Sequence, residues 1–138
     1  MKTKLNSILT LGAVAAFTLT LVAFTAPTSQ DGDWVVPAKY KTMENKFAGG
    51  DSDGIGEDIY KQHCRSCHGN EGFGDGSKAK ELKTEMKDLT SKEVQSQTDG
   101  ELYAKAIIGH DEMPNFEKKI REEEDRWMVV NYLRELAQ

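Results

Sequence analysis

Cysteine, proline and positive charge are scarce in this sequence. Its 138 residues contain two cysteines and three prolines. Two cysteines are too few for a disulfide-built scaffold, and a tetrahedral zinc site would need further ligands. The net charge is −5, and after the first 26 residues, whose only charged side chains are Lys2 and Lys4, 16 basic residues stand against 23 acidic ones. A nucleic-acid-binding protein would need the opposite balance, so nucleic acid is not expected as a partner.

The first 26 residues have the pattern of a secretory leader. Two lysines precede an uncharged stretch from Leu5 to Ala26, which is typical of a signal peptide. The stretch is longer than the usual apolar region of about 7 to 15 residues and falls within the range of about 17 to 25 that spans a bilayer. Cleavage after Ala26 would put bulky Phe24 at the third position before the cut. Residues 1–26 are therefore either a cleaved signal peptide or a signal anchor. The rest of the chain is predicted to be periplasmic or on the extracytoplasmic face, either soluble after cleavage or associated with the membrane through residues 5–26.

Residues 27–54 are predicted to form an extracytoplasmic linker. They include four glycines and one isolated apolar group, Trp34 to Tyr40. Two interpretations of this group stay open. It is a docking segment for a partner, or it packs back onto the domain; scattered apolar groups at a surface are common.

Residues 55–138 have helical periodicity and no alternating strand pattern. Apolar residues recur three and four positions apart, which predicts amphipathic helices. The groups are Ile55, Ile59 and Tyr60; Leu82, Met86 and Leu89; Leu102, Tyr103, Ala106 and Ile107; and Val129, Tyr132, Leu133 and Leu136. We expect Asp99 to cap the third helix, Gly109 to end it, and the acidic run Glu122 to Asp125 to lie near the start of the last. A domain of this size buries a small core on its own, so another group is expected to fill its centre.

The segment CRSCH at residues 64–68 is a C-x-x-C-H motif, which attaches a c-type haem. Two cysteines three residues apart on one turn present their sulfurs to the two vinyl groups of a porphyrin, and the histidine that follows supplies an imidazole to the iron. The sequence thus predicts one covalent haem c, held by Cys64 and Cys67, with His68 as the proximal iron ligand. Two weaker alternatives are a thioredoxin-like site, for which no βαβ pattern is visible, and a zinc site that uses both cysteines and two histidines.

Around this motif the chain resembles class I c-type cytochromes. Gly56, Tyr60 and Cys64 repeat the family's glycine, aromatic residue and first cysteine at steps of four, and Trp127 to Leu136 is similar to its C-terminal helix. The resemblance covers residues 55–138 and implies a small all-α fold of about four to five short helices around one haem. Because glycine has no side chain, it permits a close helix crossing in which Tyr60 packs against the last helix.

The resemblance also implies a distal ligand. Met113-Pro114 is similar to the family's distal Met-Pro loop and lies between the third and last predicted helices. Proline stiffens the loop and keeps the methionine out of helical geometry. Met113 is therefore expected to be the distal iron ligand. His110 is its rival, and a bis-imidazole iron would have a lower potential.

A glycine-rich segment, residues 69–76, follows His68. It lacks the Gly-Lys-Ser/Thr ending of a phosphate-binding loop, and no strand leads into it. We expect its glycines to let the backbone run close to the porphyrin edge, with Phe73 near the ring. Tyr60 is expected to pack against the haem or the last helix.

These residues predict a one-electron carrier with His/Met axial ligation in an extracytoplasmic respiratory-type chain, either mobile or a subunit of a larger redox complex, and not an enzyme in its own right. The alternative is a gas-binding or sensory haem domain with an open sixth coordination site. A typical dihaem peroxidase is excluded, because the sequence has one C-x-x-C-H motif. Since acidic residues dominate the body, redox partner proteins are expected to present basic docking patches.

Overall fold

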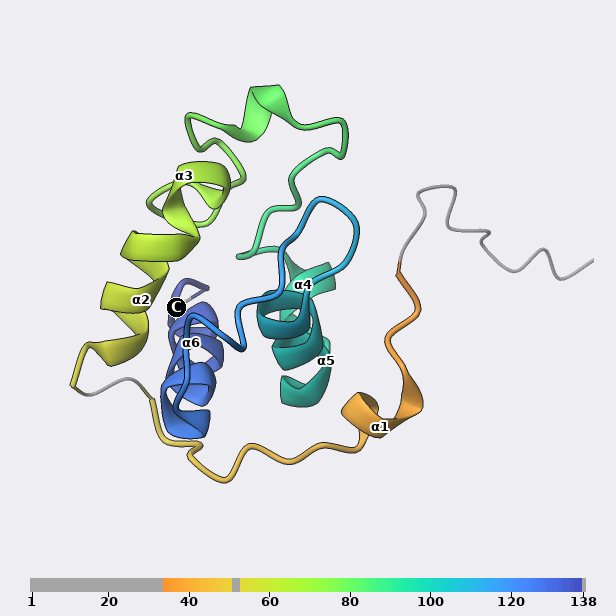
Figure 1. Cartoon of the computed structure of the whole chain (residues 1–138), viewed down its shortest axis with the longest axis vertical. Helices are drawn as coiled ribbons and strands as arrows, with labels where there is room; N and C mark the ends of the chain where they lie inside the picture. Colours follow the sequence, from red (N-terminus) through yellow and green to blue (C-terminus); the bar gives the residue numbers. More distant parts are fainter. Residues whose placement is uncertain (1–33, 51–52, 138) are drawn as a thin grey trace, which may run out of the picture. The chain divides into compact units, whose positions relative to one another are not determined.

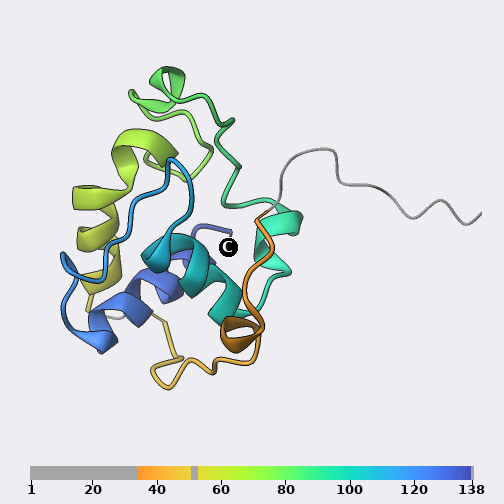
Figure 2. The same ribbon diagram turned by 45° about the vertical axis from the view of Figure 1, so that its right-hand side comes forward.

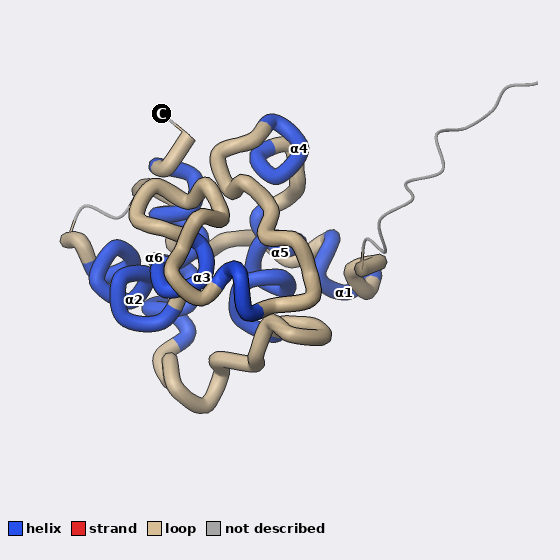
Figure 3. Tube along the Cα trace, turned by 90° about the horizontal axis from the view of Figure 1, so that it is seen from above, coloured by secondary structure: helices blue, strands red, loops and turns tan. Residues whose placement is uncertain are grey.

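The computed structural model describes residues 34–50 and 53–137. Within them the protein is helical and has no β-strand, only an isolated bridge between His110 and Met113 (Figures 1 and 3). The helices are α1 (Ala38–Lys41), α2 (Ile55–His63), α3 (Arg65–His68), the 3₁₀-helix η1 (Ala79–Glu81), α4 (Lys92–Gln95), α5 (Asp99–Tyr103), the π-helix η2 (Ala104–Ile108) and α6 (Glu123–Glu135). The predicted all-α class is confirmed, with α2 to α6 in the part of the chain that resembles class I cytochromes.

Helices α2 and α6 pack side by side and form the frame of the fold (Figures 1 and 2). Gly56 is buried where they cross, and a Cβ atom there would lie 2.1 Å from the carbonyl oxygen of Met128. Only glycine permits so close an approach. One turn further along α2, the rings of Tyr60 and Tyr132 lie with their centroids 5.2 Å apart. The crossing predicted from Gly56 and Tyr60 is therefore present.

Helix α5 continues directly into the π-helical turn η2. The Thr98 hydroxyl caps α5 by accepting a hydrogen bond from the Glu101 amide, and the Glu101 carboxylate accepts one from the Thr98 amide. The prediction that Asp99 is the cap was wrong by one residue, because the reciprocal capping box uses the Thr98/Glu101 pair. At the other end the Gly109 amide donates to the Ala104 carbonyl at 3.0 Å. The helix ends at Gly109, whose φ is 72°, as predicted.

The segment 82–89 is not helical, although its apolar spacing predicted a helix. Three of its amides donate to distant acceptors instead of to carbonyl groups four residues earlier. Those of residues 83–84 donate to the carboxylate of Glu112, at 3.0 and 2.8 Å, and that of Leu89 donates to the Gly72 carbonyl at 2.8 Å. A pattern of three apolar residues is compatible with an irregular segment, and here tertiary contacts override it.

Residues 34–50, which we call the N-terminal strap, lie against the helices, with α1 beside α5 (Figure 2). Val36 is only 4% exposed. Asn45 donates to Asn131 of α6 at 2.8 Å, and Asn131 donates to the Phe47 carbonyl at 2.9 Å. Of the two interpretations of the apolar group in this segment, these contacts support packing onto the domain.

The predicted leader, residues 1–26, lies outside the described residues. Among those described, no helix has both the length and the apolar character needed to cross a membrane. The strap and the helices belong to one compact unit, and the boundary between residues 27–54 and 55–138 stays a prediction.

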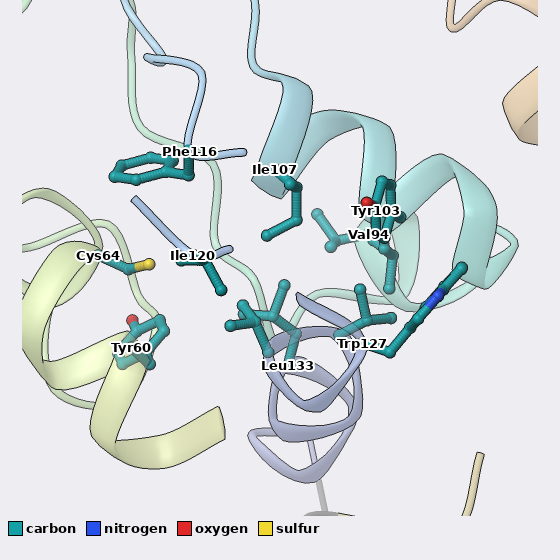
Figure 4. Close-up of a cluster of buried hydrophobic side chains, with 12 residues drawn as sticks. Tyr60, Cys64, Val94, Tyr103, Ile107, Phe116, Ile120, Trp127 and Leu133 are labelled. Carbon is teal, nitrogen blue, oxygen red and sulfur yellow. The ribbon is translucent and has the colours of Figure 1, made fainter. Parts of the chain in front are cut away.

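The core lies where α2, α5, η2 and α6 meet (Figure 4). Its largest fully buried side chains are those of Trp127, Tyr60, Ile107, Val129 and Val130. The sulfur of Cys64 points from the end of α2 into this cluster. The first cysteine of the motif is therefore part of the core and not of the surface.

Candidate haem site

The C-x-x-C-H motif occupies one helical turn directly after α2. Cys64 ends α2 and precedes α3, and its carbonyl accepts hydrogen bonds from the amides of Cys67 and His68 at 3.1 and 3.0 Å. The three side chains predicted to hold the haem are thus fixed to a single turn that continues the frame helix.

The glycine loop, residues 69–78, folds back onto this turn, and its amides donate hydrogen bonds to the carbonyl groups of the turn. The hydrogen bonds run from the amides of Gly74, Gly76 and Lys78 to the carbonyls of His68, Cys67 and Ser66, at 2.9, 3.1 and 2.8 Å. A Cβ atom on Gly76 would lie 2.5 Å from the Ser66 carbonyl oxygen. The last carbonyls of a helix have no partner within it, so the glycines let the loop supply those partners. Sequence analysis did not predict this role.

Tyr60 and Phe73, two side chains predicted to lie near the haem, have different surroundings. Tyr60 is fully buried, and its hydroxyl donates to the Gly69 carbonyl at 2.8 Å, so it links α2 to the start of the glycine loop. Its burial raises the pKa of Tyr60 far above the ordinary value of 10.0. Phe73 is 55% exposed, and its placement near the porphyrin stays a prediction.

The Cys64 thiol and the His68 imidazole are held in their neutral forms. Burial, and secondarily the neighbouring Cys67, raises the pKa of the Cys64 thiol to about 12. Burial lowers the pKa of His68 below its ordinary value of 6.5. Both cysteines are free thiols, so no disulfide occupies them. A neutral imidazole is the form that binds a metal.

Nδ1 of His68 is buried and has no hydrogen-bond partner among the described residues. Buried polar atoms in folded proteins are nearly always bonded, so this ring is placed for an interaction that the polypeptide does not supply. An uncommitted imidazole with two free thiols on the same turn is the donor set of a covalently attached haem. The residues therefore fit the group: Cys64 and Cys67 would hold the porphyrin and His68 would bind the iron, which supplies one-electron chemistry when bound.

Met113 lies on the distal loop, which we define as residues 109–116. Its amide donates to the His110 carbonyl at 2.9 Å, and the Phe116 amide donates to the Ile107 carbonyl at 2.8 Å, which closes the loop against η2. Met113 is half-buried and packs against the same core cluster that contains the first cysteine of the motif.

His110, the rival ligand on this loop, lies at the surface. Its side chain is 46% exposed, and its Nε2 is 3.3 Å from an Asp111 carboxylate oxygen. Its ring stacks on that of Trp34, with centroids 5.0 Å apart and an interplanar angle of 12°. Met113 is therefore the more buried of the two candidates.

The alternatives weighed from the sequence need arrangements that the described residues do not form. No three His, Cys, Asp or Glu side chains among them are grouped as a metal site, which a zinc centre would require. No strand precedes the motif within residues 34–50 and 53–63, as a thioredoxin-like site would require.

The helical fold and the motif turn together define a c-type cytochrome domain, with haem-based electron transfer as its activity. The family is given by comparison with known proteins. The model of the family described as cytochrome c oxidase, cbb3-type, subunit III, matches residues 53–133, and the chain belongs to that family. No curated protein matches the chain. The predicted membership of the c-type cytochromes is thus confirmed.

Two residues of structural importance were missed by sequence reasoning. Asn131 is a buried polar residue within the apolar spacing of α6, and that interruption is a signal that could have identified it. Glu112 contacts a segment distant in the chain, and no local pattern points to such a contact. Trp34 belongs to the apolar group that was expected either to dock a partner or to pack onto the domain, but its partner His110 was not predicted.

Proposed function

We propose that the protein is a one-electron carrier whose haem c is attached through Cys64 and Cys67 and has His68 and Met113 as axial ligands. The main support is that Cys64 and Met113 contact one buried apolar cluster, whereas the rival His110 lies at the surface. Two ligands fixed on separate, well-bonded segments keep the same arrangement in both oxidation states. Little rearrangement then accompanies each transfer.

We further propose that the chain works outside the cytoplasm in a respiratory-type electron-transfer chain. The family description names an oxidase subunit, which supports a redox complex as partner, either through permanent assembly or through repeated encounters. The intact mass of the haem-loaded protein distinguishes a cleaved leader from an anchor at residues 5–26. Association with a basic partner is expected to slow as salt rises; a rate independent of salt would contradict that expectation.

The decisive test of the ligand set is the substitution Met113→Ala in the haem-loaded protein. We expect loss of the weak near-infrared sulfur-to-iron band of the ferric form and a lower reduction potential, because a soft thioether favours ferrous iron. Met86→Ala is the matched control, because Met86 is also half-buried but lies on the irregular segment 82–89. A band that persists in Met113→Ala and disappears in Met86→Ala would overturn the assignment.

The same protein tests the gas-binding alternative. With Met113 bound in both oxidation states, carbon monoxide must displace it and therefore binds the ferrous form slowly. Five-coordinate spectra and rapid carbon monoxide binding by the wild-type protein would favour a sensory haem domain.

A further inference from the structure

The N-terminal strap reaches the loop that contains Met113. The indole of Trp34 and the imidazole of His110 are nearly parallel, at 12°, with centroids 5.0 Å apart. Offset-stacked aromatic pairs of this separation contribute to stability beyond the area that they bury. The contact joins two segments that are far apart in the sequence.

His110 stands directly before the turn of the distal loop, which is formed by Asp111 and Glu112. It follows Gly109, whose φ of 72° favours glycine. A hypothetical Cβ on Gly109 would lie 2.3 Å from the Met113 carbonyl oxygen, so the two sides of the turn are in close contact. The Met113 amide donates to the His110 carbonyl at 2.9 Å, and the two residues form a β-bridge. A contact that holds His110 therefore also holds the backbone of Met113.

The strap is itself attached to the body at several points. Val36, two residues after Trp34, is 4% exposed. The strap backbone runs so close to α5 that a Cβ on Gly100 would overlap the Tyr40 carbonyl oxygen. Further along, Asn45 donates to Asn131. Trp34 thus extends from a segment with fixed attachments, which can restrain the loop that it touches.

We propose that Trp34 is a positioning residue for Met113: by stacking on His110 it restrains the distal loop and keeps the thioether at the iron. The inference rests on the proposed ligation by His68 and Met113. Trp34 does not touch the reacting atoms. Its effect passes through His110 and through the hydrogen bond from the Met113 amide to the His110 carbonyl.

The test compares Trp34→Leu with Trp34→Phe in the haem-loaded full chain. Both variants keep an apolar side chain at this position, but only phenylalanine retains a ring to stack on His110. Val35→Ala is the matched control, because Val35 is 79% exposed and belongs to the same segment. Asn45→Ala weakens the attachment of the strap to α6 at its other end. Its effect on the same measurements shows how much general destabilisation alone contributes.

The probe is imidazole, which binds the ferric iron only when Met113 has left. Its apparent affinity therefore reports the fraction of protein with a released methionine. We expect Trp34→Leu to bind imidazole about 2- to 12-fold more tightly than the wild type, the range that corresponds to one aromatic pair. Hydrogen exchange of residues 109–116 should be faster by a similar factor. Trp34→Phe and Val35→Ala should remain close to the wild type in both measurements.

The outcomes separate the inference from the proposed function. A near-infrared band in the wild type, with imidazole affinity and loop exchange unchanged in Trp34→Leu, would overturn the role of Trp34 and leave the ligand set intact. Equal effects of Trp34→Leu and Asn45→Ala would show general destabilisation and also overturn it. A wild-type protein without the band would refute Met113 ligation, and the inference would fail with it.

Discussion

Substitution of Gly56 by alanine tests the helix crossing that frames the haem site. The added Cβ would lie 2.1 Å from the Met128 carbonyl oxygen, 2.6 Å from its carbonyl carbon and 3.0 Å from Cβ of Tyr132. The nearest of these atoms is backbone and cannot rotate away. A carbon and an oxygen approach to about 3.3 Å without strain, so α2 would have to move away from α6 by about 1.2 Å.

The expected loss of stability is about 2 kcal/mol. Overpacking of this kind destabilises by about 3 kcal/mol at the upper end of its usual range. The higher helix propensity of alanine offsets about 1 kcal/mol of this loss. For a domain of this size the midpoint of thermal unfolding should fall by roughly 10 °C. The displacement would also separate the rings of Tyr60 and Tyr132, whose centroids are 5.2 Å apart.

The assay is thermal unfolding of the haem-loaded protein followed by circular dichroism. Gln62→Ala is the control, because Gln62 is an exposed residue of α2 and its replacement should change stability by only a few tenths of a kcal/mol. A melting temperature of Gly56→Ala equal to that of the wild type would refute the reasoning, since α2 and α6 could then not be in contact at this glycine.

Three further predictions follow from single contacts. Asn131→Ala removes the hydrogen bonds from Asn131 to the strap carbonyls of Phe47 and Gly50 and should lower the free energy of unfolding by about 2–3 kcal/mol in urea titrations; an unchanged midpoint would contradict the attachment of the strap. Tyr60→Phe removes one buried hydrogen bond and should cost about 1–2 kcal/mol near neutral pH. Because the pKa of Tyr60 is higher in the folded protein than its ordinary 10.0, the wild type should lose stability as the pH rises above that value, and Tyr60→Phe should lose less. The pKa of Glu101 is lowered from 4.5, mainly by its hydrogen bond from a backbone amide of the capping box, so its contribution is present above pH 4.5 and declines below it. Acid titration of Glu101→Gln should then show a shallower decline than the wild type.

The motif turn and the frame helices were predictable because their determinants are local. Two cysteines and a histidine within five residues share one helical turn whatever surrounds them. A glycine one turn before a buried tyrosine marks a close crossing in the same way. The end of the helix at Gly109 likewise follows from what this residue allows its own backbone to do.

One failed prediction concerns a segment whose hydrogen bonds are made with distant partners. Segment 82–89 has helical spacing, but three of its amides donate to Glu112 and to the glycine loop. For the apolar group of the strap the sequence left docking and packing open, and the structure supports packing, since Val36 is buried and Asn45 is bonded to α6. Local spacing contains no information about such partners.

The amino-acid sequence alone therefore determined the chemistry of this protein: the haem attachment motif, the candidate axial ligands and the helical class. The tertiary structure decided which candidate side chains are buried, how the glycine loop bonds the carbonyls of the motif, and that Trp34 touches the loop of Met113. The physical reason is the distance along the chain over which each effect acts. Backbone preferences and motif spacing act over a few residues, whereas burial and the partners of hydrogen bonds depend on segments that only folding brings together.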